Sequence, residues 1–200
     1  RAGLALEAAL FRIDFDDQIV NGSSVGLPLQ TFANAGKTLH QGFEIGWRAQ
    51  IGDLIGAPGN GLYLLGAYTW LFDAKFDSDQ ISGGQNIKGN RLPYAPEHLL
   101  NASVGYEFPR GLDVRFGMEH VSKQYTDNLE TGPGAANGRT GAISSYTLYN
   151  MTVNYETRRD GLSLFLVGNN LGDKTYIANR TDGIQIGRTR QIIGGVDWQF

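Results

Sequence analysis

The sequence predicts an all-β fold, an antiparallel up-and-down β-barrel that crosses a membrane, from two observations. The first is a strict alternation of apolar and polar residues along several segments, which gives each strand one apolar and one polar face. The second is an alternation of long and short connections between successive strands. Transmembrane barrels of the outer-membrane type place short turns on one side and long loops on the other, so both patterns have one explanation.

The clearest strands form a hairpin around a tight turn at Pro109-Arg110-Gly111. Apolar residues occupy every second position from Leu100 to Phe108, and the pattern restarts at Leu112. A helix over the second segment would have no apolar face, so strands are expected. Eight strands are expected in all, at about 4–19, 39–52, 61–76, 96–108, 111–126, 143–158, 161–175 and 184–200.

The apolar side of each strand is expected to face lipid, and the polar side a wet or plugged interior. In a soluble core, so many charges would each cost on the order of several kcal/mol even when paired. The expected lipid-facing positions include Phe11, Ile13, Phe15, Phe43, Ile45, Trp47, Val114, Phe116 and Met118. The expected interior positions are Arg12, Asp14, Asp16, Glu44, Arg48, Asp113, Arg115, Glu119 and Asp197. A soluble sandwich is the alternative, but it gives no reason for the alternating loop lengths.

Bulk composition excludes several other classes of protein. Charged residues make up 18% of the chain, and no run approaches the roughly 18 apolar residues of a transmembrane helix. The formal net charge is −3 without a clustered basic stripe, which argues against a nucleic-acid partner. The absence of cysteine excludes disulfides and thiolate metal sites.

Few residues suggest catalysis or metal binding. The segment Gly22–Gly26 matches G-x-S-x-G, but Pro28 follows and no helical period appears, so a loop is expected rather than a nucleophile elbow. The three histidines have no second ligand at close spacing, and two acidic segments could bind a hard cation but are expected to be ordinary polar positions. These residues are His40, His98, His120, Asp14–Asp17 and Asp77–Asp79. No enzyme activity, cofactor or metal site is expected.

Three segments resemble the barrel of TonB-dependent receptors. The motif positions are Gly89, Asn90, Pro93, Pro96 and His98 in the first, Asn170, Leu171, Asp173 and Tyr176 in the second, and Arg190 and Phe200 in the third. The segment Gly187–Arg190 is expected within the final strand, and Gly36–Glu44 further resembles receptors of the ferric-dicitrate type. The resemblance covers essentially all 200 residues.

The resemblance implies an outer-membrane receptor of a Gram-negative bacterium, with a 22-stranded barrel plugged by an N-terminal domain. Residues 1–200 would be about the last eight strands, without the plug, and the start at Arg1 suggests a processed chain or a fragment. The implied cargo is a ferric chelate, ferric citrate or another siderophore. The other implied partners are outer-membrane lipid, the protein's own N-terminal barrel and plug, and the TonB complex.

An anionic ferric chelate would need guanidinium or ammonium partners. Polar and aromatic residues in or just below the long loops are therefore the expected substrate contacts, with water or a neighbouring loop as the alternative contact for each. They are Gln80, Gln85, Asn86, Lys88, Arg91, Gln124, Tyr125, Arg139 and Arg180. The alternative function is that of a complete eight-stranded outer-membrane barrel with a structural or adhesive role.

Overall fold

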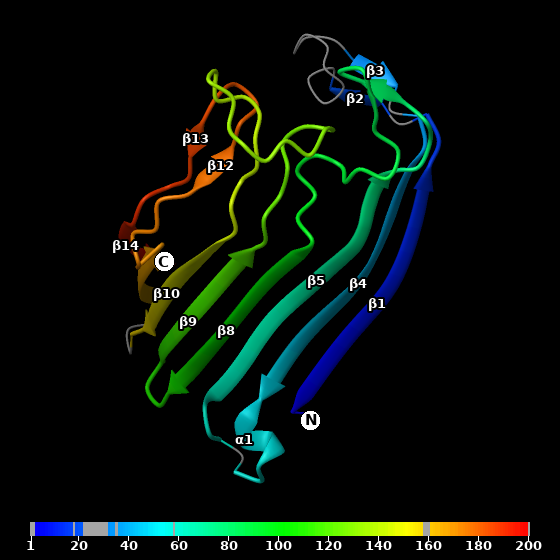
Figure 1. Ribbon diagram of the computed structural model, residues 1–200. Coiled ribbons are helices and arrows are strands. Elements are labelled where there is room, and N and C mark those ends of the chain that lie inside the picture. Colours follow the sequence, from blue (N-terminus) through cyan, green and yellow to red (C-terminus); the bar gives the residue numbers. More distant parts are fainter. Residues whose placement is uncertain are drawn as a thin grey trace.

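Eight long antiparallel strands form one sheet in chain order in the computed structural model (Figure 1). The structure describes residues 3–17, 19–21, 32–34, 36–57, 59–157 and 161–199. The strands are β1 (Leu4–Phe15), β4 (Thr38–Gln50), β5 (Leu62–Phe76), β8 (His98–Phe108), β9 (Leu112–Val121), β10 (Tyr146–Glu156), β11 (Leu162–Asn169) and β14 (Gln191–Trp198). The prediction of eight antiparallel strands is confirmed.

Short elements occupy the connections. Three small hairpins lie in the long loops, and a four-residue helix lies in the turn after β4. They are β2 (Ile19–Asn21) with β3 (Phe32–Asn34), β6 (Ile81–Ser82) with β7 (Gln85–Asn86), β12 (Ile177–Asn179) with β13 (Gln185–Ile186), and α1 (Ile51–Leu54). In the described part of the chain, no helix is long and apolar enough to cross a membrane.

The long loops all lie at one end of the sheet and the short turns at the other, as the sequence predicts (Figure 1). The turn between β8 and β9 is short because three residues, Pro109–Gly111, separate the paired Phe108 and Leu112. Arg110 and Gly111 have φ of 80° and 84°, in the left-handed region that tight turns use and that glycine adopts without strain. The two ends are called the loop end and the turn end below.

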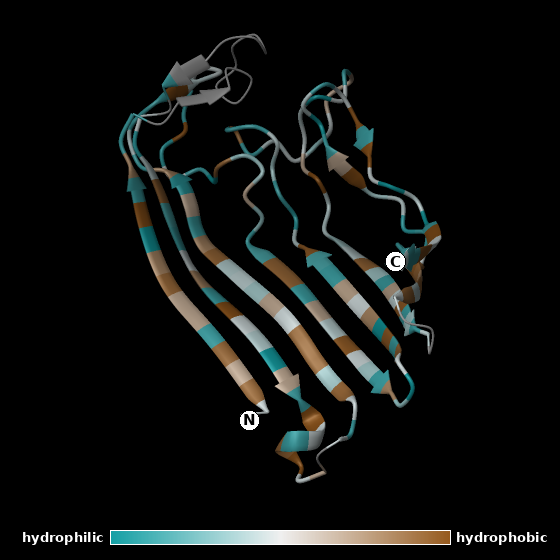
Figure 2. Ribbon diagram, turned by 180° about the vertical axis from the view of Figure 1, so that it is seen from behind, coloured by the Kyte–Doolittle hydropathy of each residue, from teal (hydrophilic) through white to brown (hydrophobic). Residues whose placement is uncertain are grey.

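The sheet is open. β1 and β14 are its two edges, and these two strands do not pair with each other in the described structure. A closed eight-stranded barrel would need that pairing, so these strands do not form the complete small barrel that was the alternative. The sheet is curved like a segment of a wider wall (Figure 2).

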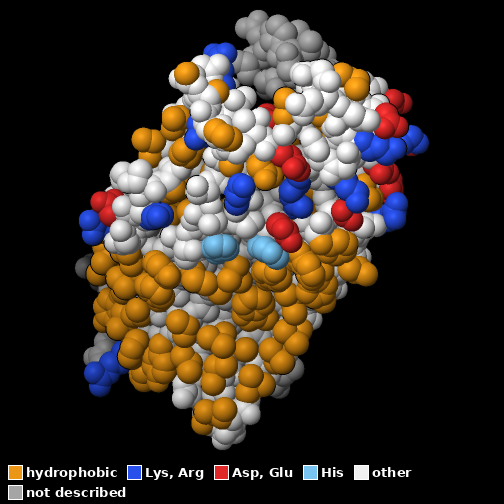
Figure 3. Space-filling model, in the orientation of Figure 1, with side chains coloured by type: hydrophobic (Ala, Val, Ile, Leu, Met, Phe, Trp, Pro, Cys, Tyr) orange, Lys and Arg blue, Asp and Glu red, His pale blue; other side chains and the backbone are white. Residues whose placement is uncertain are grey.

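The continuous register across the sheet separates an apolar face from a polar face. Neighbouring side chains on one face include the row Leu6, Trp47, Gly66, Ala102 and Met118. Figure 3 shows the hydrophobic side chains of this face as a band over its lower half, with charged residues above and two histidines along the boundary. The polar face carries Glu7, Glu44, Arg48, Asn101, Asp113, Arg115, Glu119, Asn154 and Asp197.

The facing predicted for the upper half of β1 is wrong. Leu10 pairs with Phe43 on the apolar face, so Arg12 and Asp14 share that face, above the apolar band. Phe11, Ile13 and Phe15 lie on the opposite, polar face, and Asp16 lies beyond the strand, where it pairs with Lys37. The lower half of β1, with Leu4 and Leu6, carries the apolar parity of the band.

A β-bulge in β5 reverses the facing of its upper residues. The pairing of β4 with β5 shifts between Gln41 and Phe43, which pair with Asp73 and Trp70 respectively. Two residues of β5 therefore lie opposite one residue of β4, which bends the strand locally. Above the bulge, Ala74 and Phe76 turn toward the polar face, where the loops cover them.

Two glycines on the polar face differ in the space left for a side chain, and replacing each with valine tests the packing. The ring of Tyr63 lies over Gly105, and its hydroxyl donates to Asp113 at 2.8 Å. We expect Gly105→Val to displace the ring and destabilise the fold by about 1–3 kcal/mol. The matched Gly46→Val, where an added Cβ meets only the Gly66 carbonyl at 3.9 Å, is expected to cost less. Urea unfolding of the full-length protein in detergent measures both, and equal losses would contradict this packing.

Candidate functional site: the loop layer

Three connections at the loop end, residues 77–97, 122–145 and 170–190, form what we call the loop layer. The first loop extends the sheet, because residues 89–92 run back along the upper half of β5. The Phe76 amide donates to the Asn90 carbonyl at 3.0 Å, and the Leu92 amide donates to the Ala74 carbonyl at 2.7 Å. Ile87 and Leu92 are buried against Ala74 and Phe76. The first receptor-like motif therefore anchors this loop to the sheet.

Arg91 holds the fold of the first loop from inside. Its Nε donates to the Ala95 carbonyl at 2.6 Å, and its second guanidinium nitrogen donates to the Leu71 carbonyl. Its backbone amide donates to Glu130 Oε1 at 2.6 Å, which joins the first loop to the second. Burial lowers the pKa of the Arg91 guanidinium. The Arg91 guanidinium therefore makes its hydrogen bonds to main-chain carbonyls of the first loop and of β5.

Further hydrogen bonds join all three loops. The Tyr94 amide donates to the Tyr125 carbonyl at 2.8 Å, and the Tyr94 hydroxyl accepts from the Arg180 amide at 3.2 Å. Arg180 Nη1 donates to the Gly138 carbonyl at 3.1 Å, and the Arg180 residue is only 8% exposed. Because each loop is bonded to both others, the three form one connected layer.

The second loop is ordered by its own polar groups. Asp127 Oδ1 accepts from the amides of Leu129 and Thr131 at 3.0 and 3.1 Å, which forms an Asx-type turn. The Asn128 carbonyl accepts from the side-chain amide of Asn90 at 2.9 Å. Asp127 and Asn128 are almost fully buried, although they lie in a loop.

Asn170 closes the base of the third loop. Its Nδ2 donates to the carbonyls of Lys174 and Arg188 at 2.9 and 3.0 Å, and its Oδ1 accepts from the Lys174 amide at 2.9 Å. Its φ of 48° is a conformation that Asn tolerates better than most residues. Asp173 Oδ1 accepts from the Arg190 amide at 2.9 Å. These bonds give the second receptor-like motif a structural explanation.

Other motif residues also make contacts within the fold. The ring of Tyr176 lies over Gly187 and 4.3 Å from the ring of Tyr146. Leu171 donates its amide to the Tyr149 carbonyl, and Phe200 lies outside the described residues. The expectation that Gly187–Arg190 belongs to the final strand is wrong. β14 begins at Gln191, because the preceding backbone bonds to Asn170, Asp173 and Tyr176 instead of β11.

Three of the nine expected substrate contacts are held inside the loop layer, Gln124 and Arg180 buried and Arg91 partly buried. Arg91 and Arg180 hold main-chain carbonyls, as described above. Gln124 is 8% exposed, and its backbone pairs with Ile143 in an isolated bridge. The guanidinium groups of Arg91 and Arg180 thus order the loops, and ligand contact by any of the nine residues stays a prediction.

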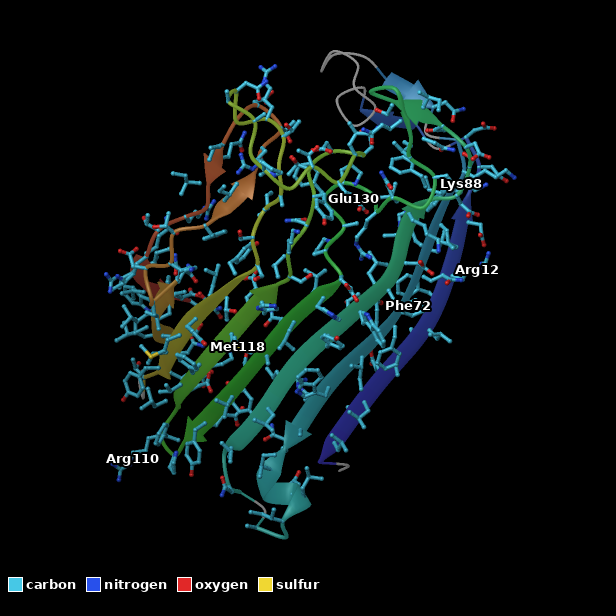
Figure 4. All side chains as sticks on the ribbon, in the orientation of Figure 1. Arg12, Phe72, Lys88, Arg110, Met118 and Glu130 are labelled. Carbon is cyan, nitrogen blue, oxygen red and sulfur yellow. The ribbon has the colours of Figure 1, made fainter. Side chains whose placement is uncertain are left out.

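The other six lie closer to the surface. Gln85, Asn86 and Lys88 are exposed at the β6–β7 hairpin, where Lys88 lies 3.3 Å from Asp79 and Asn86 donates to the same carboxylate. Gln80 is half-buried, and its main-chain carbonyl accepts from the Ile87 amide at 2.9 Å. Arg139 is exposed, and Tyr125 is half-buried. In Figure 4, Lys88 and Glu130 lie at the loop end, and Arg110 lies at the turn end.

The candidate metal-binding residues do not converge. His98 Nδ1 lies 2.8 Å from the Tyr68 hydroxyl, and His120 Nδ1 lies 2.8 Å from Thr147 Oγ1. Asp14 is held by Arg12, and Asp79 by Asn86 and Lys88, which keep the pKa of Asp79 below its usual value. Within the described ranges, no group of three or more His, Asp or Glu residues is placed to hold a metal ion. The Gly22–Gly26 segment lies outside those ranges.

Sequence reasoning missed the residues that tie the loops together. Tyr94, Glu130 and Gly138 take part in bonds between loops, and their partners are distant in sequence. Tyr94 lies within the first receptor-like motif, and that motif was the sequence signal that could have identified it. The other two have no local pattern that would indicate a partner.

Comparison with known proteins identifies the family. Residues 1–171 match the family described as TonB dependent receptor-like, beta-barrel, and the chain belongs to it. The fold agrees with that of the ferric citrate transporter FecA, with a TM-score of 0.81 and 25% identity over 99% of this chain and 29% of FecA. It also resembles the ferric yersiniabactin uptake receptor FyuA of Yersinia pestis, with a TM-score of 0.72 and 20% identity over 100% of this chain and 28% of FyuA.

Curated relatives are named as ferrioxamine or siderophore receptors. The Ferrioxamine B receptor of Salmonella typhimurium is 33% identical over 122 residues, which are 56% of this chain and 16% of that receptor. The probable TonB-dependent siderophore receptor PiuA of Acinetobacter baumannii is 27% identical over 184 residues, which are 86% of this chain and 21% of PiuA. The chain thus spans about a fifth or less of the length of these relatives.

The role of Asn170 can be tested by proteolysis. We expect Asn170→Ala to loosen the third loop, because two carbonyls and one amide lose their partner, each at about 1 kcal/mol. Trypsin should then cleave at Lys174, Arg180 or Arg188 several-fold faster in the full-length protein. Asn154→Ala, on the polar face of β10, is the matched control and should leave the rate unchanged. Equal rates in wild type and Asn170→Ala would contradict the clamp.

Proposed function

We propose that residues 1–200 are the C-terminal part of the barrel domain of an outer-membrane receptor that takes up a ferric chelate with energy from TonB. The plug domain and the remaining strands lie outside this chain in the proposal. The observation that carries it is the match of the whole open sheet to FecA, together with membership of the receptor barrel family. The ferric chelate is cargo, and the proposal includes no catalytic step and no resident cofactor.

The two faces of the sheet support a place in the outer membrane. The apolar face carries exposed large side chains in every long strand except β4, such as Leu10, Val104 and Phe116, which are 78%, 42% and 44% exposed. Exposed apolar surface of this extent on a soluble protein would be a liability, whereas lipid covers it at no cost. The loop end would face the outside and the turn end the periplasm. The two sheet edges would be covered by strands of the same barrel, because an open edge in lipid leaves backbone groups unpaired.

The loop layer supports a role in binding, because it is ordered and lies at the end of the sheet that would face the medium. Of the residues expected to contact the chelate, those near the surface remain our candidates: Gln80, Gln85, Asn86, Lys88, Tyr125 and Arg139. Arg91, Gln124 and Arg180 would act by ordering the loops. The identities of the relatives favour a siderophore, and ferric citrate is one candidate among ferric chelates.

The membrane placement predicts opposite results for charges on the two faces. Val104→Arg on the apolar face should destabilise the barrel by about 2–4 kcal/mol, or prevent its assembly, because the charge would face hydrocarbon. Asn101→Arg on the polar face, opposite Glu119, should be tolerated. Folding into lipid vesicles, followed by urea unfolding, measures the difference. A tolerated Val104→Arg would contradict a lipid-facing side.

Uptake tests the proposed activity. A strain that lacks its own siderophores and its other ferric receptors should grow on at least one ferric chelate only when the full-length receptor and TonB are both present. Removing either should abolish growth on that chelate but not growth on excess free iron. Growth that does not depend on TonB, or on the receptor, would rule the proposal out.

A further inference from the structure

Tyr94 is the residue at which the three loops of the loop layer meet. It belongs to the first loop, its amide donates to the Tyr125 carbonyl of the second at 2.8 Å, and its hydroxyl accepts from the Arg180 amide of the third at 3.2 Å. The bond from Arg91 Nε to the Ala95 carbonyl closes the turn that contains it. The backbone and the hydroxyl of Tyr94 are therefore both fixed by bonds to other parts of the layer.

The backbone of Tyr94 is held in a conformation that a tyrosine rarely adopts. Its φ is 57°, in the left-handed region that a side chain as large as tyrosine disfavours. Glu130, which accepts from the Arg91 amide across the same two loops, also has a positive φ, of 54°. Strained residues of this kind persist where the surrounding bonds over-determine them, and they gather at sites that clamp ligands. The strain in the loop layer thus lies where its first two loops join.

The ring of Tyr94 remains uncovered although the polar groups of the residue are bonded. Tyr94 is 37% exposed. The other exposed large apolar side chains of the three loops, Ile81, Ile184 and Ile186, lie in or beside the β6–β7 and β12–β13 hairpins. A tyrosine that served only to join loops would be expected to bury its ring. An anchored and uncovered ring instead offers rigid contact area to a ligand at little cost in conformational entropy.

The bond to Arg180 places Tyr94 on the concave side of the wall. The first loop joins β5 to β8 and the third joins β11 to β14, with β9 and β10 between them in the sheet. β11 and β14 recede from the viewer in Figure 1, and the apolar band faces the viewer in Figure 3, so the sheet curves around its polar face. The direct path between the two loops runs inside that curve, on the side where a ferric chelate would pass.

We propose that Tyr94 is the residue of the loop layer against which the ferric chelate binds, with the face of its ring as the contact. The inference rests on the proposed function and adds a residue to the six surface candidates named above. The bonds of the Tyr94 amide and hydroxyl fix the ring before the chelate arrives, which lowers the entropy cost of binding. A chelate on this ring also lies beside the parts of the second and third loops that Tyr94 bonds.

Two substitutions at Tyr94 separate the ring from the hydroxyl. Tyr94→Phe and Tyr94→Ala both remove the acceptor of the Arg180 amide, but only Tyr94→Ala removes the ring. Uptake of radiolabelled iron is measured in the receptor strain described above, with the iron given as ferrioxamine B, as ferric dicitrate or as a ferric tris-catecholate. For each complex that is taken up, we expect the half-saturating concentration to be about tenfold higher in Tyr94→Ala than in Tyr94→Phe, with the maximal rate unchanged.

The comparison of the two variants distinguishes a contact from a purely structural role, because loss of the hydroxyl affects both alike. Ile186→Ala, which removes an exposed side chain of the β12–β13 hairpin, is the control and should leave the half-saturating concentration unchanged. Equal values in Tyr94→Phe and Tyr94→Ala would overturn the inference and leave the proposed function intact. Absence of TonB-dependent uptake of every ferric complex by the wild-type receptor would instead reject the proposed function.

Oxidative footprinting of the wild-type, full-length receptor tests the contact without a substitution. The probes are the gallium complexes of desferrioxamine B, of citrate and of the tris-catecholate, because gallium replaces iron without redox chemistry. Oxidation of Tyr94 by hydroxyl radicals, located by mass spectrometry, should fall several-fold when the gallium form of a transported complex is added. Phe108 at the turn end, which is 45% exposed, should be oxidised equally in both samples. Tyr94 oxidation that does not change with the complex would also overturn the inference.

Discussion

The satisfaction of main-chain hydrogen bonds is the constraint on which the rest of this structure depends. A strand in lipid can bond only to its neighbours, because hydrocarbon offers no partner for an N–H or C=O group. The long strands pair with one another without a gap from β1 to β14, and the register of the described pairs shifts at the bulge between β4 and β5. Since facing alternates with period two, this register fixes which side chains of all eight strands share a face. One apolar strand therefore determines the orientation of the whole sheet.

That constraint explains where sequence reasoning succeeded and where it failed. In β8 and β9 the alternation from Leu100 to Met118 coincides with the apolar band, so the facing could be predicted locally. In β1 the residues Phe11, Ile13 and Phe15 alternate just as clearly, yet they lie above the band on the polar face. The sequence shows that residues alternate but not which of the two alternating sets faces the apolar side. That facing is set by the register with β4, which is a contact between residues distant in the chain.

The loops obey the same constraint by other means. They have no regular ladder, so their buried carbonyls need side-chain donors. Arginine offers five N–H groups and asparagine two, and Arg91, Arg180 and Asn170 fill this role. The sequence could indicate that these residues lie in the loops, and the motifs drew attention to Arg91 and Asn170. It could not indicate their partners, because Gly138 and Arg188 carry no signal of being bonded. The positive charges of Arg91 and Arg180 thus have a structural use that their position in a loop does not reveal.

The division of labour within the loop layer follows from this use of side chains. An arginine whose guanidinium bonds to loop carbonyls cannot contact a ligand without breaking those bonds. The same holds for the glutamates and aspartates that order the turns. The surface of the layer nevertheless keeps charge of both signs, since Lys88, Arg139 and Asp182 are exposed beside neutral groups such as Gln85 and Asn86. Its interior is not fully satisfied either, because Asp127 Oδ2, Asn128 Nδ2 and Arg180 Nε have no hydrogen-bond partner in the described structure. A ligand at this surface would therefore meet cations, carboxylates and neutral donors together, and the arrangement of these groups would decide which ligand fits.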